Sequence, residues 1–203
     1  MSKSLLSFQN EGFFFNIVWM KEQDINPWQT LSSKKIYDNP WISLTEHQVI
    51  NPGGGNGIYG EVHFKNLAIG IIVLDDSNNT WLVGQYRFPL KSYSWEIPEG
   101  GGQENIDPLI SAKRELLEET GIEAESWTEI QKIHLSNSVS DELGIIFLAQ
   151  NLSFGESKPE ESEELALKKI PFIQAYEMVL NGEITDSLSV AAILKLKITH
   201  FSS

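Results

Sequence analysis

Three glutamates stand close together near the middle of the chain, at a spacing that suits metal chemistry. Glu115, Glu118 and Glu119 occupy positions i, i+3 and i+4, which share one face of an α-helix. Carboxylates held so close repel one another and raise each other's pKa values unless a cation neutralises them. We therefore expect them to converge on a hard divalent cation, because Mg²⁺ and Mn²⁺ prefer oxygen ligands. The alternative is a solvated acidic face on which Arg114 pairs with Glu118.

A segment rich in glycine leads toward these glutamates. Trp95-Glu96-Ile97-Pro98-Glu99 is followed directly by Gly100-Gly101-Gly102. Glycine has no Cβ, so its backbone can approach a metal ion or a phosphate closely. The sequence therefore predicts a loop over residues 95–102 that borders a metal or phosphate site.

The acidic helix has clear start and stop signals. Asp107 precedes Pro108 as an N-cap residue, and Gly121 follows Thr120 as a C-terminal stop. We predict that its core side carries the apolar residues Leu109, Ala112, Leu116 and Leu117.

The surrounding elements predict a mixed α/β sandwich. Two further helices are expected, over Phe172 to Leu180 and from Ser187, with Asp186 as N-cap, to about Lys197. The almost continuously apolar run from Leu67 to Leu74 is typical of a strand buried on both faces. Further strands are expected over 80–88, 130–135, 144–149 and 164–170, and short extended pieces over 34–64, where the Asn51–Gly57 loop predicts a hairpin connection.

Composition excludes several classes of function. The chain has 203 residues with 15 Lys+Arg against 28 Asp+Glu, a formal net charge of −13, which disfavours a general nucleic-acid binder. It has no cysteine, so disulfides, iron–sulfur clusters and thiol nucleophiles are excluded. We find no apolar run of about 20 residues and no secretory signal pattern, and we expect a cytoplasmic protein without membrane contact.

The motif around the three glutamates resembles a known family. Gly100 and the run Arg114-Glu115-Leu116-Leu117-Glu118-Glu119-Thr120-Gly121-Ile122 match the Nudix box, Gly-x5-Glu-x7-Arg-Glu-U-x-Glu-Glu-x-Gly-U, where U is aliphatic. One fixed position departs, because Ile106 stands where the family has its first Glu. That Glu is chiefly a structural partner in the family, so its loss affects local support more than catalysis.

The resemblance extends over about Ile36 to Ile198 and points to one branch. Gln85-Tyr86-Arg87, Trp95 to Gly100, Ser140-Asp141-Glu142 and the acidic cluster at 160–164 are similar to segments of the ADP-ribose pyrophosphatase and nucleoside diphosphate sugar hydrolase branch. This implies a Nudix-type α/β/α sandwich with a mixed sheet over residues 65–203. It also implies a preceding β-rich segment, residues 1–64, that joins a homodimer and lets each partner complete the other's base pocket.

The resemblance also implies roles for individual residues. Glu115, Glu118 and Glu119, with the backbone carbonyl of Glu99, hold Mg²⁺, for which Mn²⁺ can substitute. The catalytic residues would be Glu161, Glu163 and Arg114, and either Glu161 or Glu163 would be the general base. The substrate-binding residues would be Arg87, Glu96, Tyr37 and Trp41. From the residues alone, Arg87 is equally well explained as an ion-pair partner in the sheet, Glu96 as a partner of a ribose or of Arg114, and Tyr37 and Trp41 as packing residues.

The implied activity is hydrolysis of the pyrophosphate in a nucleoside diphosphate sugar, ADP-ribose first and GDP-mannose or similar compounds next. The products are a nucleoside monophosphate and a sugar phosphate. Other Nudix substrates, such as dinucleoside polyphosphates, NADH, coenzyme A or capped RNA, are the enzymatic alternatives. A Nudix-like protein that senses a nucleotide without turnover is the alternative of another class.

Overall fold

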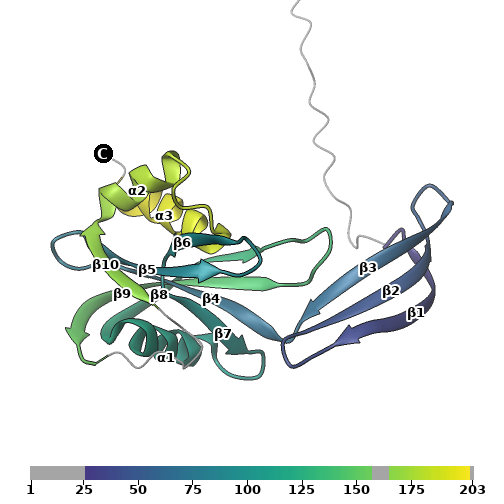
Figure 1. The fold of residues 1–203 in the computed structure, drawn as a ribbon, viewed down its shortest axis with the longest axis horizontal. Coiled ribbons are helices and arrows are strands. Elements are labelled where there is room, and N and C mark those ends of the chain that lie inside the picture. The colour runs from purple at the N-terminus through teal and green to yellow at the C-terminus, as the bar shows by residue number, and fades with distance from the viewer. Residues whose placement is uncertain (1–25, 157–164, 202–203) are drawn as a thin grey trace, which may run out of the picture.

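The computed structural model describes residues 26–156 and 165–201. They form a two-sided α/β body and a separate three-stranded sheet that projects from it (Figure 1). The strands and helices are β1 (Gln29–Asp38), β2 (Ile42–Ile50), β3 (Asn56–Phe64), β4 (Asn66–Val73), β5 (Asn79–Arg87), β6 (Ser92–Glu96), β7 (Glu99–Gln103), α1 (Pro108–Thr120), β8 (Ile122–His134), β9 (Leu143–Phe154), β10 (Ala166–Pro171), α2 (Phe172–Leu180) and α3 (Ser187–His200).

The body has two apolar cores on opposite faces of a mixed sheet. The sheet order is β7-β4-β9-β8, with β4 and β9 parallel, and a second sheet runs β10-β5-β6. On β4, Ile71 packs with Leu116 of α1, whereas Ile72 packs with Phe172 of α2 and Ile193 of α3. This alternation follows from the two-residue period of a strand. The predicted α/β/α sandwich and the doubly buried strand are confirmed.

Helix α1 begins and ends where the capping residues predict. The Asp107 side chain accepts a hydrogen bond from the Leu109 amide at 3.0 Å, and Gly121 has φ of 70°, a left-handed conformation that suits glycine. One core assignment was wrong: Leu117 is 37% exposed. Besides Ala112 and Leu116, the buried residues of α1 are Ser111, Glu119 and Thr120.

The segment predicted as a glycine-rich loop is instead two short strands. β6 pairs with β5, and β7 pairs antiparallel with β4, where Gly100 lies opposite Ile69 and Gly102 opposite Leu67. Glycine has a low strand propensity, but the ladder to β4 supplies the backbone hydrogen bonds. The turn at Ile97-Pro98 therefore connects two strands, and the glycines lie at the sheet edge beside α1.

The N-terminal sheet, β1-β2-β3, has little core of its own. Every residue of β1 is exposed, and Ser43 and Val49 are the residues of β2 that are buried. The predicted hairpin at Asn51–Gly57 is confirmed as the β2–β3 turn. No helix among the described residues is long and apolar enough to cross a membrane.

The loop between β8 and β9, residues 135–142, connects this sheet to the body, and we call this loop the joint. The segment between β8 and β9 runs alongside β3, with the Val62 amide donating to the Val139 carbonyl at 2.8 Å. Tyr59 donates its hydroxyl to the Ser138 carbonyl at 2.6 Å, and His63 pairs with Asp141 at 2.5 Å. The sheet is therefore held at the edge of β3 rather than by a shared apolar core.

Candidate active site

The acidic face of α1 lies directly against the glycines of β7. A Cβ on Gly100 would stand 2.0 Å from the carboxyl carbon of Glu115, so a side chain at position 100 cannot coexist with Glu115 in this position. The glycine therefore lets the strand and the carboxylate approach each other this closely.

Arg114 forms a bridge over two of the three predicted ligands. Its Nη2 donates to Glu115 Oε1 at 2.6 Å and to the Gly101 carbonyl at 2.9 Å, and its Nη1 donates to Glu118 Oε2 at 2.7 Å. Burial lowers the pKa of Arg114, but the charges of Glu115 and Glu118 outweigh it and raise that pKa from its ordinary value. The predicted i+4 pairing of Arg114 with Glu118 is confirmed.

The third carboxylate points toward the start of β7. Glu119 is buried, and its Oε2 accepts a hydrogen bond from the Glu99 amide at 3.0 Å. Glu99 Oε1 in turn accepts from the Ser189 hydroxyl at 3.0 Å. Burial, followed by the neighbouring Asp186 carboxylate, raises the pKa of Glu99 well above its ordinary value.

The three carboxylates share one side of α1, as predicted, but they do not converge. Among residues 26–156 and 165–201, no three acidic, histidine or cysteine side chains are arranged to hold a metal ion. In this arrangement Arg114 engages Glu115 and Glu118, while Glu119 turns to the Glu99 amide. The donor set itself, all oxygen, fits a hard divalent cation.

Arg87 and Glu96 form a second, more enclosed ion pair. Arg87 Nε lies 3.0 and 3.1 Å from the two Glu96 oxygens, and Nη2 makes a further short contact with Oε2. The Glu96 side chain is only 3% exposed, while that of Arg87 is 37% exposed. The hydrogen bond to Glu96 raises the pKa of Arg87. The ion-pair alternative for Arg87 is therefore confirmed, and Glu96 binds Arg87 rather than Arg114.

A cleft joins these groups. One cavity of about 410 Å³ is lined by Arg87, Glu99 and Trp41, among others. A neighbouring cavity of about 580 Å³ is lined by Arg114 and Glu115, among others. Both are lined by Trp41, Asn66, Gly100 and Gly101. Trp41, which belongs to the turn between β1 and β2, thus faces the cleft, whereas Tyr37 on β1 lines neither cavity.

Sequence reasoning gave no role to Glu142, which also lines the cleft. Burial, followed by the charges of Asp186 and Asp141, raises its pKa. In the sequence, the run Ser140-Asp141-Glu142 indicates only a similarity to the branch. The cap signal at Asp186 predicted a helix start, but nothing in the sequence indicated that α3 begins beneath Glu99.

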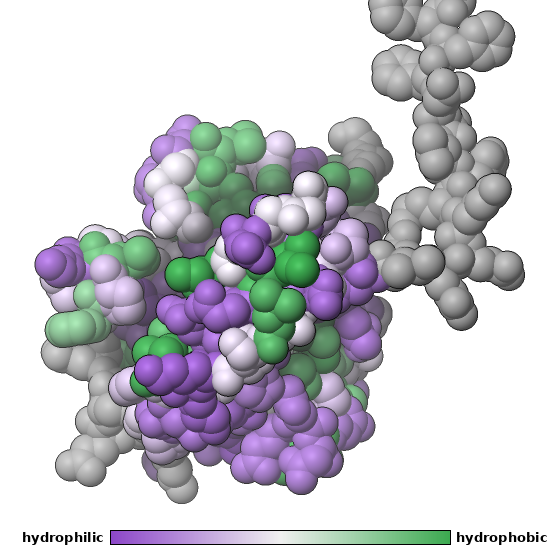
Figure 2. Space-filling model, turned by 90° about the vertical axis from the view of Figure 1, so that its right-hand side faces the viewer, coloured by the Kyte–Doolittle hydropathy of each residue, from purple (hydrophilic) through white to green (hydrophobic). Residues whose placement is uncertain are grey.

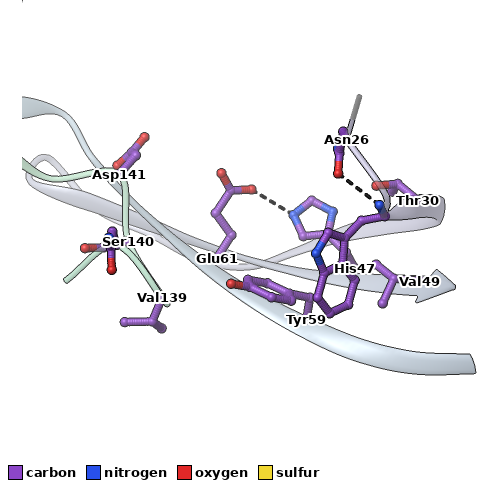
Figure 3. Close-up of a pocket in the computed structure, with 11 residues that line it drawn as sticks. Asn26, Thr30, His47, Val49, Tyr59, Glu61, Val139, Ser140 and Asp141 are labelled. Atoms are coloured by element: carbon purple, nitrogen blue, oxygen red, sulfur yellow. Dashed lines mark hydrogen bonds and ion pairs between the residues drawn. The ribbon is translucent and has the colours of Figure 1, made fainter. Parts of the chain in front are cut away.

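Another cavity, of about 310 Å³, lies between the N-terminal sheet and the joint. Figure 3 shows His47 and Tyr59 side by side on neighbouring strands, with Glu61 bonded to His47 at 2.9 Å and Asp141 across the opening. The Trp28 and Tyr59 rings meet edge to face, with centroids 5.3 Å apart. This cavity is aromatic on one side and acidic on the other.

Glu161 and Glu163, the predicted candidates for the general base, lie outside the described residues.

Comparison with known proteins places this site in a family. Residues 64–186 match the model of the NUDIX domain, which covers more than half of the chain. The chain belongs to the Nudix family. Residues 28–62 match the nucleoside diphosphate sugar hydrolase N-terminal domain. The predicted resemblance is therefore confirmed in both parts, and so is the prediction of a Nudix hydrolase.

Individual relatives agree with this assignment. The chain is 33% identical over 184 residues to an ADP-ribose pyrophosphatase of Mycobacterium tuberculosis (strain ATCC 25618 / H37Rv), covering 86% of this chain and 84% of that protein. It is 30% identical over 172 residues to an ADP-ribose pyrophosphatase of Bacillus subtilis (strain 168), covering 84% and 92%. A crystal structure of an ADP compounds hydrolase shares the fold, with a TM-score of 0.77 at 18% identity over 87% of this chain and 95% of that one. Nudix hydrolases generally need divalent metal ions.

Proposed function

We propose that this Nudix chain hydrolyses the pyrophosphate of nucleoside diphosphate sugars, with ADP-ribose first and GDP-mannose and similar compounds next. The products are a nucleoside monophosphate and a sugar phosphate. The observation that carries the proposal is that Glu115, one of the three carboxylates of α1, borders the same cleft as Arg87 and Trp41. The names of the two ADP-ribose pyrophosphatase relatives support the choice of substrate.

The proposed cofactor is Mg²⁺, with Mn²⁺ as a substitute. Glu115, Glu118 and Glu119 would hold it together with the backbone carbonyl of Glu99, and it supplies positive charge for the non-bridging oxygens of a diphosphate. A protein of net charge −13 has few other cations to offer such a substrate. The oxygen-only donor set supports a hard ion over zinc or copper.

The side chains of the cleft have distinct tasks in this proposal. Arg87 donates hydrogen bonds to a phosphate from its exposed side, and the buried Glu96 carboxylate fixes the plane of its guanidinium. Trp41 stacks on the base. Tyr37 is proposed as a second aromatic contact, although it lines neither cavity of the cleft. Glu161 or Glu163 deprotonates the attacking water, an assignment supported by the sequence resemblance.

We also propose that the protein is a homodimer, with the cytoplasm as its compartment and residues 1–64 and 65–203 as its two domains. The cross-strand pairs Tyr37–Leu44 and Leu44–Val62 place these three side chains on one face of the N-terminal sheet, and Ile58 shares that face four residues before Val62. Figure 2 shows hydrophobic surface exposed on the side of the molecule that carries this sheet. A second copy would cover it, and the N-terminal segment of each copy would then contribute to its partner's base pocket.

The test is release of AMP from ADP-ribose in the presence of Mg²⁺. We expect Glu119→Gln to lower kcat/KM by about a hundredfold or more, because it removes a buried carboxylate from the proposed metal site. The matched control is Glu123→Gln, the same change at an exposed site four residues further on, which should retain activity. Trp41→Ala should raise KM about tenfold through lost stacking, with a smaller effect on kcat.

A substrate panel separates the alternatives. ADP-ribose, GDP-mannose, NADH, coenzyme A and diadenosine polyphosphates are compared by kcat/KM under the same conditions. A preference for one of the last three would reassign the chain within the family. Tight binding of ADP-ribose with no product at any metal concentration would instead indicate a nucleotide sensor.

A further inference from the structure

Arg114 contacts two of the three carboxylates proposed to bind the metal ion. Its guanidinium spans Glu115, Glu118 and the Gly101 carbonyl, at 2.6, 2.7 and 2.9 Å. The carboxylate oxygens that it contacts, Glu115 Oε1 and Glu118 Oε2, are among the atoms that a divalent cation would use. The two carboxylates are thus already neutralised, in part, by a side chain of the same helix.

The geometry of the group fits this substitution. No three acidic, histidine or cysteine side chains in the described part of the chain are arranged around a common point, although Glu115, Glu118 and Glu119 share one side of α1. Glu115 and Glu118 follow the fork of Arg114, whose two terminal nitrogens hold their oxygens apart. The side chains must rearrange before all three can bind one ion.

We infer that Arg114 acts as an internal counter-cation that competes with the divalent metal for Glu115 and Glu118 and leaves them when the metal binds. This inference rests on the proposed metal site and adds that Arg114 weakens metal affinity while stabilising the metal-free helix. In this inference Arg114 is a positioning residue, because it acts through Glu115 and Glu118 and not on the substrate itself.

Arg114 is free to move in a way that Arg87 is not. The Arg114 side chain is 44% exposed and its partner Glu118 is 34% exposed, so separating these two costs little. Glu115 is only 12% exposed, so its carboxylate needs the metal ion to replace the charge of Arg114. Releasing Arg87 would leave the Glu96 carboxylate buried without its charge partner, which is costly.

The wall of the cavity beside Arg114 explains why the arginine pairs with the proposed metal ligands. The adjoining cavity of about 580 Å³ contains Arg114 and Glu115, and part of its wall is apolar, formed by Ile106 and Ile110. Position 106 therefore presents no carboxylate that could draw the guanidinium away from the metal ligands. In the metal-free protein, Arg114 is held by those ligands instead.

The experiment measures Mn²⁺ binding to the full-length protein without substrate, by calorimetry and by electron paramagnetic resonance of free Mn²⁺. Arg114→Gln removes the competing cation, and Arg114→Lys keeps the charge but cannot bridge two carboxylates in the same plane. Lys113→Gln is the matched control, because Lys113 is an exposed neighbour for which no ion pair is found within the described residues. Thermal unfolding with and without Mn²⁺ is recorded for each variant.

We expect Arg114→Gln to tighten Mn²⁺ binding about tenfold and Arg114→Lys about threefold, whereas Lys113→Gln changes it less than twofold. Without metal, Arg114→Gln should unfold at a lower temperature than Lys113→Gln, and saturating Mn²⁺ should raise its melting temperature more than that of the parent protein. The tighter binding by Arg114→Lys separates competition for ligands from a general charge effect.

Two results would overturn the inference while leaving the metal site intact. Weaker Mn²⁺ binding by Arg114→Gln and Arg114→Lys would mean that the arginine orients the ligands for the metal. Equal tightening by Arg114→Gln and Lys113→Gln, with no change in Arg114→Lys, would mean that only net charge matters. Failure of the parent protein and all variants to bind Mn²⁺ would instead remove the proposed metal site, and the inference with it.

Discussion

The Nudix body and the N-terminal sheet are both built from β-strands, yet they are stabilised in opposite ways. In β4 of the body, Ile69, Ile71 and Ile72 are completely buried between helices on both faces. In β1 of the N-terminal sheet, every residue is exposed. The body therefore has its own core, whereas the sheet depends on surfaces outside itself: the joint at β3 and, as proposed, a second copy of the chain.

The largest effect expected from this contrast is on folding stability. Phe172 is buried in the body and stacks on Phe201 with centroids 4.6 Å apart. We expect Phe172→Ala to lower the free energy of unfolding by about 3–5 kcal/mol, because it leaves a cavity in the core. Ile58→Ala, in the N-terminal sheet, should cost less than about 1 kcal/mol under conditions where the protein is monomeric. Urea denaturation of both variants measures the difference, and equal costs would contradict the comparison.

The next effect is on assembly. Ile58 is 67% exposed on the apolar face of the N-terminal sheet, and a charge there should raise the dimer dissociation constant by at least about tenfold because it cannot be buried unpaired. Ile58→Glu is compared by analytical ultracentrifugation with Leu180→Glu, the same kind of change at a residue of α2 that is 62% exposed. If Leu180→Glu disrupted the dimer and Ile58→Glu did not, the interface would lie on the helices.

The smallest effect is electrostatic and belongs to the body. Burial raises the pKa of Asp75, but Lys169 at 2.8 Å and the hydrogen bonds from Asn79 outweigh it and lower the pKa to about 2. The ionised carboxylate therefore stabilises the fold above its ordinary pKa of 3.8, and this contribution is lost as the pH falls from 3.8 toward 2.

Asp75→Asn tests this pH dependence. The variant should be less stable than the parent protein at pH 6, by about 1 kcal/mol or less, since the ion pair is partly exposed. The difference should shrink below pH 3.8. Urea denaturation at pH 6, 4 and 3 measures it, and a difference that grew toward low pH would show that the sign is wrong.

Local signals in the sequence were sufficient for most elements of the body. The cap at Asp107 and the stop at Gly121 gave both ends of α1, because a cap acts through hydrogen bonds to its own helix. The strands β6 and β7 were not predicted, since glycine and proline disfavour strands locally and the pairing of Gly100 with Ile69 depends on a distant segment. Long-range pairing of this kind leaves no trace in a single sequence.

The candidate site shows the same division. The spacing of Glu115, Glu118 and Glu119 placed them on one side of a helix, which follows from helical geometry alone. Whether they converge depends on Arg114. The same sequence allows the arginine to pair with Glu115 and Glu118, or to leave these carboxylates to a metal ion. Arg87 illustrates this point, because an arginine at this position suits both phosphate binding and an ion pair with Glu96.

The most direct test of the account is a crystal structure of the protein grown with Mn²⁺ and a non-hydrolysable ADP-ribose analogue, with anomalous scattering recorded at the manganese edge. The account predicts an anomalous peak within bonding distance of Glu115, Glu118 and Glu119, next to the diphosphate of the analogue, with Arg114 withdrawn from the carboxylates. An analogue bound elsewhere, with no peak at α1 and the Arg114 bridge intact, would contradict it.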